Sequence, residues 1–301
     1  MTHTTVFKAP ISIALAGLML AAGLAACKAP SDIQTQAVET SGPTEKLAPI
    51  RKALSCLPSG AAIIAAHRGT DQRWTDQAEN SIGGLKALIA HGTLMAEIDV
   101  AGLKDDTLIT FHDGVWDETS TAKGPISVSR KSDLEKILLR SRAGELTADR
   151  PPLFSDMLKT AKGKMYMEVD FKSSADPRAV ISAIRKADMA DQVLLIAYTP
   201  DQANLFERLA PDMLRSNPLK ATQTDHAVWL GYDVANDNRA KTLKSKDNYI
   251  IGRIGDPKRQ PPLKSLRTAA DILVTDQAER YDGVIGLTPK TRAEFETCLS
   301  S

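Results

Sequence analysis

The run Ala61-Ala62-Ile63-Ile64-Ala65-Ala66-His67-Arg68-Gly69 carries the clearest fold signal in this chain. Its first six residues are small or branched, apolar and uncharged, which is typical of a strand buried on both faces of a parallel sheet. The run then ends abruptly in an ionisable histidine, an arginine and a glycine. Ligands bind at the carboxyl ends of the strands in parallel α/β folds, so we expect His67 and Arg68 to lie at a functional site.

Short apolar runs alternate with helical patterns over roughly 240 residues, which is close to the usual size of a (β/α)8 barrel. We therefore predict one α/β domain, a TIM barrel, in residues 44–301, with an elaborated loop at 114–151 after the third strand. The count of eight strands is not fixed, because the run 213–215 is weak and the run 228–230 competes with it for the same place. The predicted strands are 61–66, 94–100, 107–111, 164–171, 192–197, 213–215, 249–254 and 271–274, and the predicted helices include 81–90, 132–139, 154–161, 177–187 and 201–209.

The overall charge gives no reason to expect a nucleic-acid partner. The 301 residues contain 38 basic and 37 acidic side chains, and the formal net charge is +1. Nucleic acids and anionic membrane surfaces attract strongly basic proteins or long basic patches. The hydrophobic content of 43% is ample for a large buried core.

The N-terminus has the features of an export signal. Lys8 precedes a short apolar stretch at 9–22, and small residues follow it, which is the order of a charged region, an apolar region and a cleavage site. The tetrapeptide Leu24-Ala25-Ala26-Cys27 resembles the lipobox of bacterial lipoproteins, in which the cysteine is lipidated. We expect a signal peptide at 1–26, a polar tether at 27–43, and a protein anchored through Cys27 on the periplasmic side of the bacterial cell envelope. A short membrane anchor or a buried helix is the alternative.

Two further cysteines remain for an oxidising compartment. Cys56 precedes the first predicted strand and Cys298 lies close to the C-terminus, and the two ends of a domain usually lie near each other. We predict a disulfide between them. The alternative is that both are small buried residues.

From residue 44 onward, a short helical pattern is expected to plug or flank the barrel.

Ionisable side chains recur with a period of two at the ends of the predicted strands. Side chains two apart on a strand point to the same face, which in a barrel is the interior or the mouth. An open antiparallel sheet would instead make them a solvated face. Four successive strands with titratable groups at the same end favour a functional site. These groups are Glu97 and Asp99, His112 and Asp113, Glu168, Asp170 and Lys172, and Asp276, besides His67.

Their chemistry indicates a hard cation and an anionic ester. Three or four carboxylates without cysteine favour Ca²⁺ or Mg²⁺ over zinc. Two imidazoles, His67 and His112, could take and give a proton, and Arg68 and Lys172 could stabilise negative charge.

The same residues resemble a known family. His67-Arg68-Gly69, Glu79-Asn80-Ser81, Glu97-Ile98-Asp99 and His112-Asp113 are similar in kind and order to the H-R-G, E-N-T, E-x-D and H-D motifs of the glycerophosphodiester phosphodiesterases. The similarity continues at 117–124, 152–158, 170–172 and 274–276. Spaced motifs in the right order are a much stronger signal than any single one.

The resemblance implies a TIM barrel that uses a bound divalent ion to cleave a glycerophosphodiester into an alcohol and glycerol 3-phosphate. It implies that His67 and His112 are the general acid/base pair. It further implies phosphate contacts from Arg68 and Lys172, metal ligation by Glu97, Asp99 and a carboxylate of the fourth predicted strand, and support from Glu79 and Asn80.

Several positions depart from the family pattern. Asp170 stands where the family usually has Glu, and its shorter side chain reaches about 1.5 Å less, so Glu168 is an alternative or second ligand. Glu118, the pair Ala197-Tyr198 and the lack of Trp at 250–254 also differ. These differences leave the alcohol open. A phospholipase acting on lysophospholipid or another membrane phosphodiester is an alternative, and a non-catalytic lipoprotein that binds a phosphorylated ligand is a second one.

Overall fold

The computed structural model describes residues 47–218, 226–232, 238–244, 248–254 and 268–301. The predicted signal peptide at 1–26, its lipidation site Cys27 and the tether at 27–43 lie outside the described residues. Within the described part of the chain, no helix has both the length and the apolar character needed to cross a membrane.

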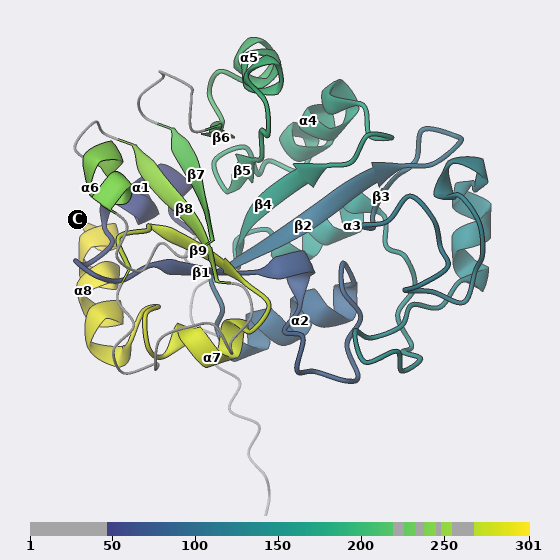
Figure 1. Ribbon diagram of the computed structural model, residues 1–301, viewed down its shortest axis with the longest axis horizontal. Helices are drawn as coiled ribbons and strands as arrows, with labels where there is room; N and C mark the ends of the chain where they lie inside the picture. The colour runs from purple at the N-terminus through teal and green to yellow at the C-terminus, as the bar shows by residue number, and fades with distance from the viewer. Residues whose placement is uncertain (1–46, 219–225, 233–237, 245–247, 255–267) are drawn as a thin grey trace, which may run out of the picture. The chain divides into compact units, whose positions relative to one another are not determined.

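Eight parallel strands close into a barrel (Figure 1). The barrel closes because β1 pairs with β9 on one side and with β2 on the other. This arrangement confirms the predicted (β/α)8 fold. The barrel strands are β1 (Ile63–Ala66), β2 (Met95–Gly102), β4 (Tyr166–Phe171), β5 (Val193–Leu195), β6 (Leu214–Asn217), β7 (Ala227–Tyr232), β8 (Tyr249–Ile254) and β9 (Ile272–Thr275).

The prediction that residues 107–111 form a barrel strand is wrong. Strand β3 (Leu108–Thr110) pairs antiparallel with the end of β2, with Val100 opposite Thr110 and Gly102 opposite Leu108. The connection from β2 to β3 is a short turn, whereas a parallel neighbour needs a crossover of about a dozen residues or more. The barrel reaches eight strands because β6 and β7, between which the sequence left the choice open, both belong to it.

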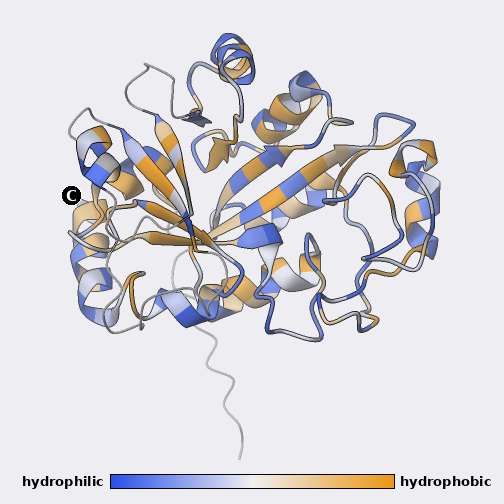
Figure 2. Cartoon of the chain, in the orientation of Figure 1, coloured by the Kyte–Doolittle hydropathy of each residue, from blue (hydrophilic) through white to orange (hydrophobic). Residues whose placement is uncertain are grey.

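Helices surround the barrel, and many of their apolar residues face the strands (Figures 1 and 2). Side chains that cap helix starts explain several boundaries: Ser81, Asp176 and Thr199 accept hydrogen bonds from the first-turn amides of α2, α4 and α5. The helices are α1 (Ile50–Ser55), α2 (Ile82–His91), α3 (Phe154–Ala161), α4 (Pro177–Lys186), α5 (Pro200–Leu209), α6 (Asn238–Lys244), α7 (Ala278–Asp282) and α8 (Pro289–Ser300).

Successive residues of each barrel strand point alternately into two apolar clusters, one inside the barrel and one between the strands and the helices. On β2, for example, Met95 joins the cluster inside the barrel, whereas Ala96 and Ile98 join the cluster between strands and helices. Helix α1 plugs the amino-terminal end of the barrel, because its buried residues Ile50, Ala53 and Leu54 belong to the inner cluster.

A disulfide ties α1 to the last helix. Cys56, directly after α1, is bonded to Cys298 in α8, and their Cα atoms are 5.6 Å apart. This is the pairing that the sequence predicts.

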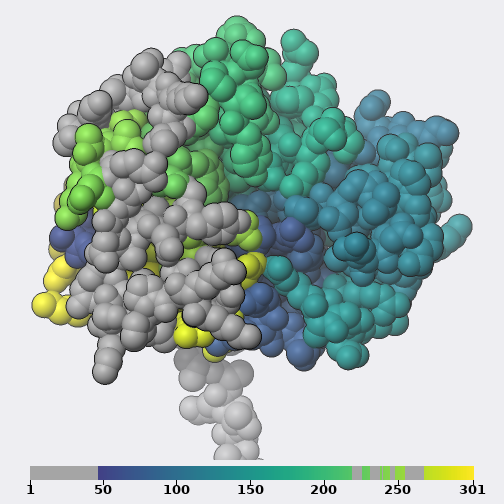
Figure 3. Space-filling view, viewed as in Figure 1, coloured from purple at the N-terminus to yellow at the C-terminus, as the bar shows by residue number. Residues whose placement is uncertain are grey.

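Residues 114–151 form an elaborated segment that packs against β2, β3 and Phe111 in a small apolar cluster, in which the rings of Phe111 and Trp116 lie 4.6 Å apart. They belong to the blue-to-teal region at the right of Figure 3. Two short 3-10 helices lie here, η2 (Ile126–Val128) and η3 (Lys131–Lys136). The prediction of an α-helix at 132–139 is wrong, because the chain becomes extended at Ile137 and Leu139 pairs with Ser120.

Candidate active site

The inward-facing rows of the strands continue from the apolar barrel interior into polar groups at the carboxyl end. On β1 the row runs through Ile63 and Ala65 to His67, because alternate residues of a strand share a face. On β2 it runs from Met95 to Glu97 and Asp99. The alternation of side chains along each strand therefore places the apolar residues of the barrel interior and the ionisable residues at the mouth on the same face of the sheet.

These rows meet at a cavity of about 270 Å³ at the barrel mouth. The sequence-predicted residues His67, Arg68, Glu97, Asp99, His112, Asp170 and Lys172 all line it, together with Ile196, Tyr198, Trp229, Arg253 and Val274. Glu79 and Asn80 do not line the cavity but bond to residues that do. Glu168 is the one predicted metal ligand that lies deeper.

A tight turn follows β1 and aims the first polar residues. Arg68 has φ of 56°, in the left-handed region that costs a non-glycine residue energy. Two hydrogen bonds hold it there: the Arg68 amide donates to Glu97 Oε2 at 2.9 Å, and its carbonyl accepts from the Asn80 amide at 2.6 Å. The turn allows the neighbouring side chains of His67 and Arg68 both to reach the cavity.

The His67 ring is held by a carboxylate. Its Nδ1 lies 2.7 Å from Asp276 Oδ1, and its Nε2 lies 3.8 Å from Glu97 Oε2. Burial lowers the pKa of His67 below 6.5, and Arg253 and Arg68 act in the same direction against the opposing effect of Asp276. Nη2 of Arg253, which can only donate, also lies 3.2 Å from Nδ1, but the Asp276 carboxylate, which can only accept, is closer. The shorter contact assigns the proton of the neutral ring to Nδ1 and leaves Nε2 as a proton acceptor.

Asp276 itself is ionised. Burial alone would raise its pKa, but the hydrogen bond to His67 and the charges of His67, Arg142 and Arg253 bring the pKa well below its ordinary value. Arg142 donates to Asp276 Oδ1 at 2.6 Å, and Arg253 approaches Oδ2 at 3.7 Å.

His112 lies on the other side of Arg68. Its Nδ1 is 2.6 Å from Asp113 Oδ1, and its Nε2 is 3.0 Å from Nη2 of Arg68. Nη1 of the same guanidinium donates to Glu79 Oε1 at 2.8 Å. Each of the two histidines is thus oriented by its own aspartate, and Arg68 extends between the two sides of the site.

Three carboxylates, those of Glu97, Asp99 and Asp170, offer oxygens that all lie within 4.8 Å of one another. Burial and the charge of Asp99 raise the pKa of Glu97 well above its ordinary value. Burial would do the same to Asp99, but the Lys172 ammonium, 2.6 Å away, and the Asn80 amide hold its pKa below the ordinary value.

This cluster fits a hard divalent cation. Its donors are oxygens, as Ca²⁺ and Mg²⁺ prefer, and Oδ1 of Asp170 is buried without a hydrogen-bond partner among the described residues. A cation would offset the charge of these three buried carboxyl groups, of which Lys172 contacts two, Asp99 at 2.6 Å and Asp170 at 2.7 Å.

Glu168 lies one step further inside the barrel, opposite Glu97 in the strand register. It is fully buried, and neither carboxyl oxygen has a hydrogen-bond partner among the described residues. Burial, with the nearby charge of Asp170, raises its pKa to about 8. The three clustered carboxylates include Asp170 and not Glu168.

Sequence reasoning did not assign roles to several residues that shape the site. Asp276 was recognised as a strand-end group but not as the partner of His67. Tyr198 could have been found by continuing the inward row of β5 past the strand end, and Arg253 is a charged residue two positions after the inward Ile251. Trp229 required knowledge that β7 belongs to the barrel. Arg142 has no such signal, because it comes from the elaborated segment.

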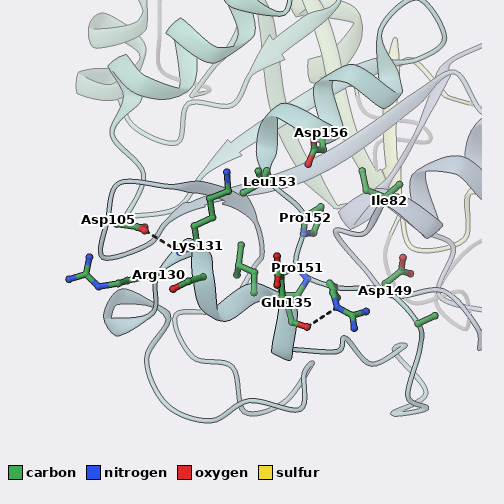
Figure 4. Close-up of a pocket in the computed structure, with 14 residues that line it drawn as sticks. Ile82, Asp105, Arg130, Lys131, Glu135, Asp149, Pro151, Pro152, Leu153 and Asp156 are labelled. Atoms are coloured by element: carbon green, nitrogen blue, oxygen red, sulfur yellow. Dashed lines mark hydrogen bonds between the residues drawn. The ribbon is translucent and has the colours of Figure 1, made fainter.

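A larger hollow of about 790 Å³ lies away from these groups (Figure 4). It is lined by residues of the elaborated segment, by β2–β3 turn residue Asp105 and by the starts of α2 and α3. Two of its polar contacts are internal, from the Lys131 amide to Asp105 and from Arg150 Nε to the Glu135 carbonyl. None of the histidines of the described chain lines it, so we place the chemistry at the barrel mouth.

Known proteins resemble this chain in sequence as well as in fold. Residues 67–245 match the model of the glycerophosphoryl diester phosphodiesterase family. A glycerophosphodiester phosphodiesterase of Caldanaerobacter subterraneus is 22% identical over 158 residues, which cover 50% of this chain and 64% of that enzyme. The chain spans slightly less than two thirds of the length of the curated relatives it matches.

Solved structures share the fold. A glycerophosphoryl diester phosphodiesterase of Parabacteroides distasonis superposes with a TM-score of 0.67 at 16% identity, over 79% of this chain and 94% of the other. An Oleispira antarctica phosphodiesterase, solved in complex with the product sn-glycerol-3-phosphate, gives a TM-score of 0.58 at 16% identity, over 77% and 98% of the two chains.

Proposed function

This chain belongs to the glycerophosphoryl diester phosphodiesterase family, and we propose that it hydrolyses a glycerophosphodiester to an alcohol and glycerol 3-phosphate. One observation carries the proposal: two histidines, three cationic side chains and three carboxylates from separate parts of the sequence line a single cavity. A small cavity of about 270 Å³ suits a phosphoglycerol group. The product-bound Oleispira enzyme supports the same substrate class.

In the proposed reaction, His67 Nε2 takes the proton of the attacking hydroxyl, either water or a hydroxyl of the substrate. A bond then forms between that oxygen and phosphorus as the bond to the leaving alcohol breaks. A protonated His112 gives its proton to the leaving oxygen, so the two histidines act as base and acid. When water attacks, this step releases glycerol 3-phosphate directly; when a substrate hydroxyl attacks, it gives a cyclic phosphate, and water then opens this ring to glycerol 3-phosphate with the two histidines in exchanged roles. The hydrogen bond to Asp276 keeps His67 Nε2 free to accept.

Arg68 and Lys172 are proposed to contact the phosphate, since both line the cavity and carry positive charge beside the histidines. Glu97, Asp99 and Asp170 would hold a divalent cation, Ca²⁺ or Mg²⁺, which supplies Lewis-acid stabilisation of the phosphate charge when bound. Asn80 keeps Asp99 in place through two hydrogen bonds of 2.7 and 2.9 Å. Glu79 does the same for Arg68.

The alcohol side of the substrate is proposed to face Tyr198 and Trp229. Both line the cavity, and Tyr198 is 59% exposed at its edge. Aromatic side chains offer apolar surface to a head group or an acyl chain.

A substrate panel tests the function. Glycerophosphocholine, glycerophosphoethanolamine and lysophosphatidylcholine are incubated with the protein in Ca²⁺, Mg²⁺ or EDTA. Glycerol 3-phosphate is measured with a coupled enzyme, and choline and phosphocholine are measured to detect cleavage of lysophosphatidylcholine, which releases no glycerol 3-phosphate. We expect glycerol 3-phosphate from the first two substrates in one of the ions and none in EDTA. Cleavage of lysophosphatidylcholine alone would indicate a phospholipase, and no hydrolysis with either ion would contradict the proposal.

Variants test the assigned roles. His67→Ala and His112→Ala should each lower turnover by about 10²–10⁴-fold. His91→Ala is the matched control, because His91 lies near Glu279 and Asp282, outside the cavity. Glu97→Ala should lose both activity and metal affinity, measured by calorimetry. A variant that binds the metal as tightly as the wild type would exclude Glu97 as a ligand.

We also propose that the protein is exported and anchored through a lipid on Cys27. The support is the charged, apolar and small-residue order of residues 8–27. Metabolic labelling with a fatty-acid analogue tests it: label on the wild type and none on Cys27→Ser is the expected result. Equal labelling of both proteins would rule out Cys27 as the anchor.

A further inference from the structure

Arg142 lies at a turn of the elaborated segment and reaches the residues that orient the proposed reaction centre. The turn is closed by the Gly144 amide, which donates to the Ser141 carbonyl at 2.9 Å. Ser141 in turn bridges to Ala78, the residue before Glu79, in an antiparallel contact. The backbone therefore presents the Arg142 side chain beside Glu79.

The Arg142 guanidinium contacts two carboxylates at once. Its Nη1 donates to Asp276 Oδ1 at 2.6 Å, and its Nε lies 4.0 Å from Glu79 Oε2. Asp276 is the partner of His67, and Glu79 is the partner of Arg68. The side chains of Asp276 and Glu79 are 17% and 7% exposed, whereas that of Arg142 is 28% exposed, so the guanidinium approaches two largely buried carboxylates from the solvent side.

We propose that Arg142 is a positioning residue that holds Asp276 and Glu79 together and thereby orients His67 for proton transfer. The inference rests on the proposed function of His67 as a base. Arg142 completes an alternating row of charges from one histidine to the other. The row runs from His67 through Asp276, Arg142, Glu79 and Arg68 to His112.

The position of Arg142 distinguishes its proposed positioning role from a role in substrate binding. Arg68 and Arg253 line the cavity, whereas Arg142 does not. Oδ1 of Asp276 accepts from Arg142 and from His67 Nδ1 at nearly the same distance, 2.6 and 2.7 Å. Loss of the guanidinium frees this oxygen to rotate, because the remaining cation, Arg253, is 3.7 Å from the other oxygen. The His67 ring then loses its fixed acceptor for the Nδ1 proton.

Kinetics of Arg142→Ala test the effect on turnover. Removal of a partner that orients ligating side chains typically lowers activity by about 10–100-fold. We expect a fall of that size in kcat with little change in KM, since Arg142 is remote from the substrate. Arg142→Lys should recover part of the loss, and added guanidinium should recover part of it in Arg142→Ala. Arg140→Ala, which removes a donor to the Gly144 carbonyl in the same turn, is the control and should keep wild-type kcat.

A second measurement does not depend on activity. Long-range proton–nitrogen NMR spectra of the histidine rings, recorded in EDTA without substrate and assigned with His67→Asn, report which nitrogen of His67 carries the proton. The wild type and Arg140→Ala should show the Nδ1-protonated ring, and Arg142→Ala should show a mixture of forms.

The outcomes separate the two proposals. Unchanged kcat in Arg142→Ala, or a fall in kcat with an unchanged His67 spectrum, overturns the role of Arg142 while the proposed function stands. If the wild type cleaves no phosphodiester, the proposed function fails, and the spectra alone decide whether Arg142 orients His67. An unchanged His67 spectrum in Arg142→Ala overturns the inference in that case as well.

Discussion

Glu168→Gln should change how the stability of the protein depends on pH. The Glu168 carboxyl is fully buried inside the barrel, and neither oxygen has a hydrogen-bond partner among the described residues. Burial, with the charge of Asp170, raises its pKa from 4.5 to about 8. The folded protein therefore keeps Glu168 neutral at pH 7, whereas the unfolded chain ionises it.

The sign follows from which state binds the proton more tightly. Below pH 4.5 both states are protonated, and the group has no effect on the free energy of unfolding. As the pH rises from 4.5 to 8, the unfolded chain loses the proton while the folded state keeps it, so stability falls by about 1.4 kcal/mol per pH unit. Above pH 8 the loss is complete, at up to about 5 kcal/mol.

Glutamine has nearly the same shape and cannot ionise, so the variant lacks this loss. Urea unfolding in EDTA, followed by circular dichroism at several pH values, measures the difference in unfolding free energy between variant and wild type. We expect this difference to shift in favour of the variant by up to about 5 kcal/mol between pH 4.5 and 8. Glu118→Gln makes the same chemical change at an exposed position and controls for the lost charge.

A constant difference across this range would refute the reasoning. It would mean that Glu168 has the same proton affinity in the folded and unfolded protein, and hence that water or an ion reaches it inside the barrel. The unfolding free energies of variant and wild type are also expected to differ by an amount that does not depend on pH, because burying the glutamine amide without hydrogen-bond partners destabilises the folded variant. The test therefore rests on how the difference changes with pH.

Three further changes follow from the packing. Reduction of Cys56–Cys298, or replacement of both by Ser, should lower the unfolding free energy by about 3–5 kcal/mol, because the bridge closes a very long loop; urea unfolding with and without reductant measures it. Gly84→Ala would place a Cβ 2.7 Å from the Gly69 carbonyl oxygen, so we expect a loss of about 1–3 kcal/mol in thermal unfolding together with reduced turnover, since the turn after β1 must move. Trp229→Ala should raise KM several-fold more than it lowers kcat in the substrate panel, and equal effects on both would exclude a binding role.

The pairing direction of β3 could not be predicted from the sequence pattern. Residues 107–111 have the composition of a strand, and they do form one, but composition does not state which neighbour a strand pairs with. The short turn from β2 decided that β3 folds back antiparallel. Conversely, the run 213–215 looked weak and 228–230 competed with it for one place, but the two runs lie in two separate barrel strands, β6 with four residues and β7 with six.

By itself, the sequence determined the barrel class, the disulfide partners and the central site residues. Period-two spacing on strands is a local property, so it places Glu97 with Asp99, and Asp170 with Lys172, without any knowledge of the fold. Buried apolar runs that end in polar groups likewise mark the mouth, as with His67. The strand patterns could be predicted because each depends on residues close together in the chain. The disulfide spans 242 positions, and its pairing followed instead from the two cysteines left after Cys27.

Only the tertiary structure decided which of these groups touch. Asp276 meets His67 across 209 positions, and Arg142 meets Asp276 across 134. Asp170 rather than Glu168 joins the carboxylate cluster, although Glu168 lies opposite the cluster member Glu97 in the strand register. Such contacts depend on how the barrel closes and where the elaborated segment folds back over its mouth, and no local pattern specifies either.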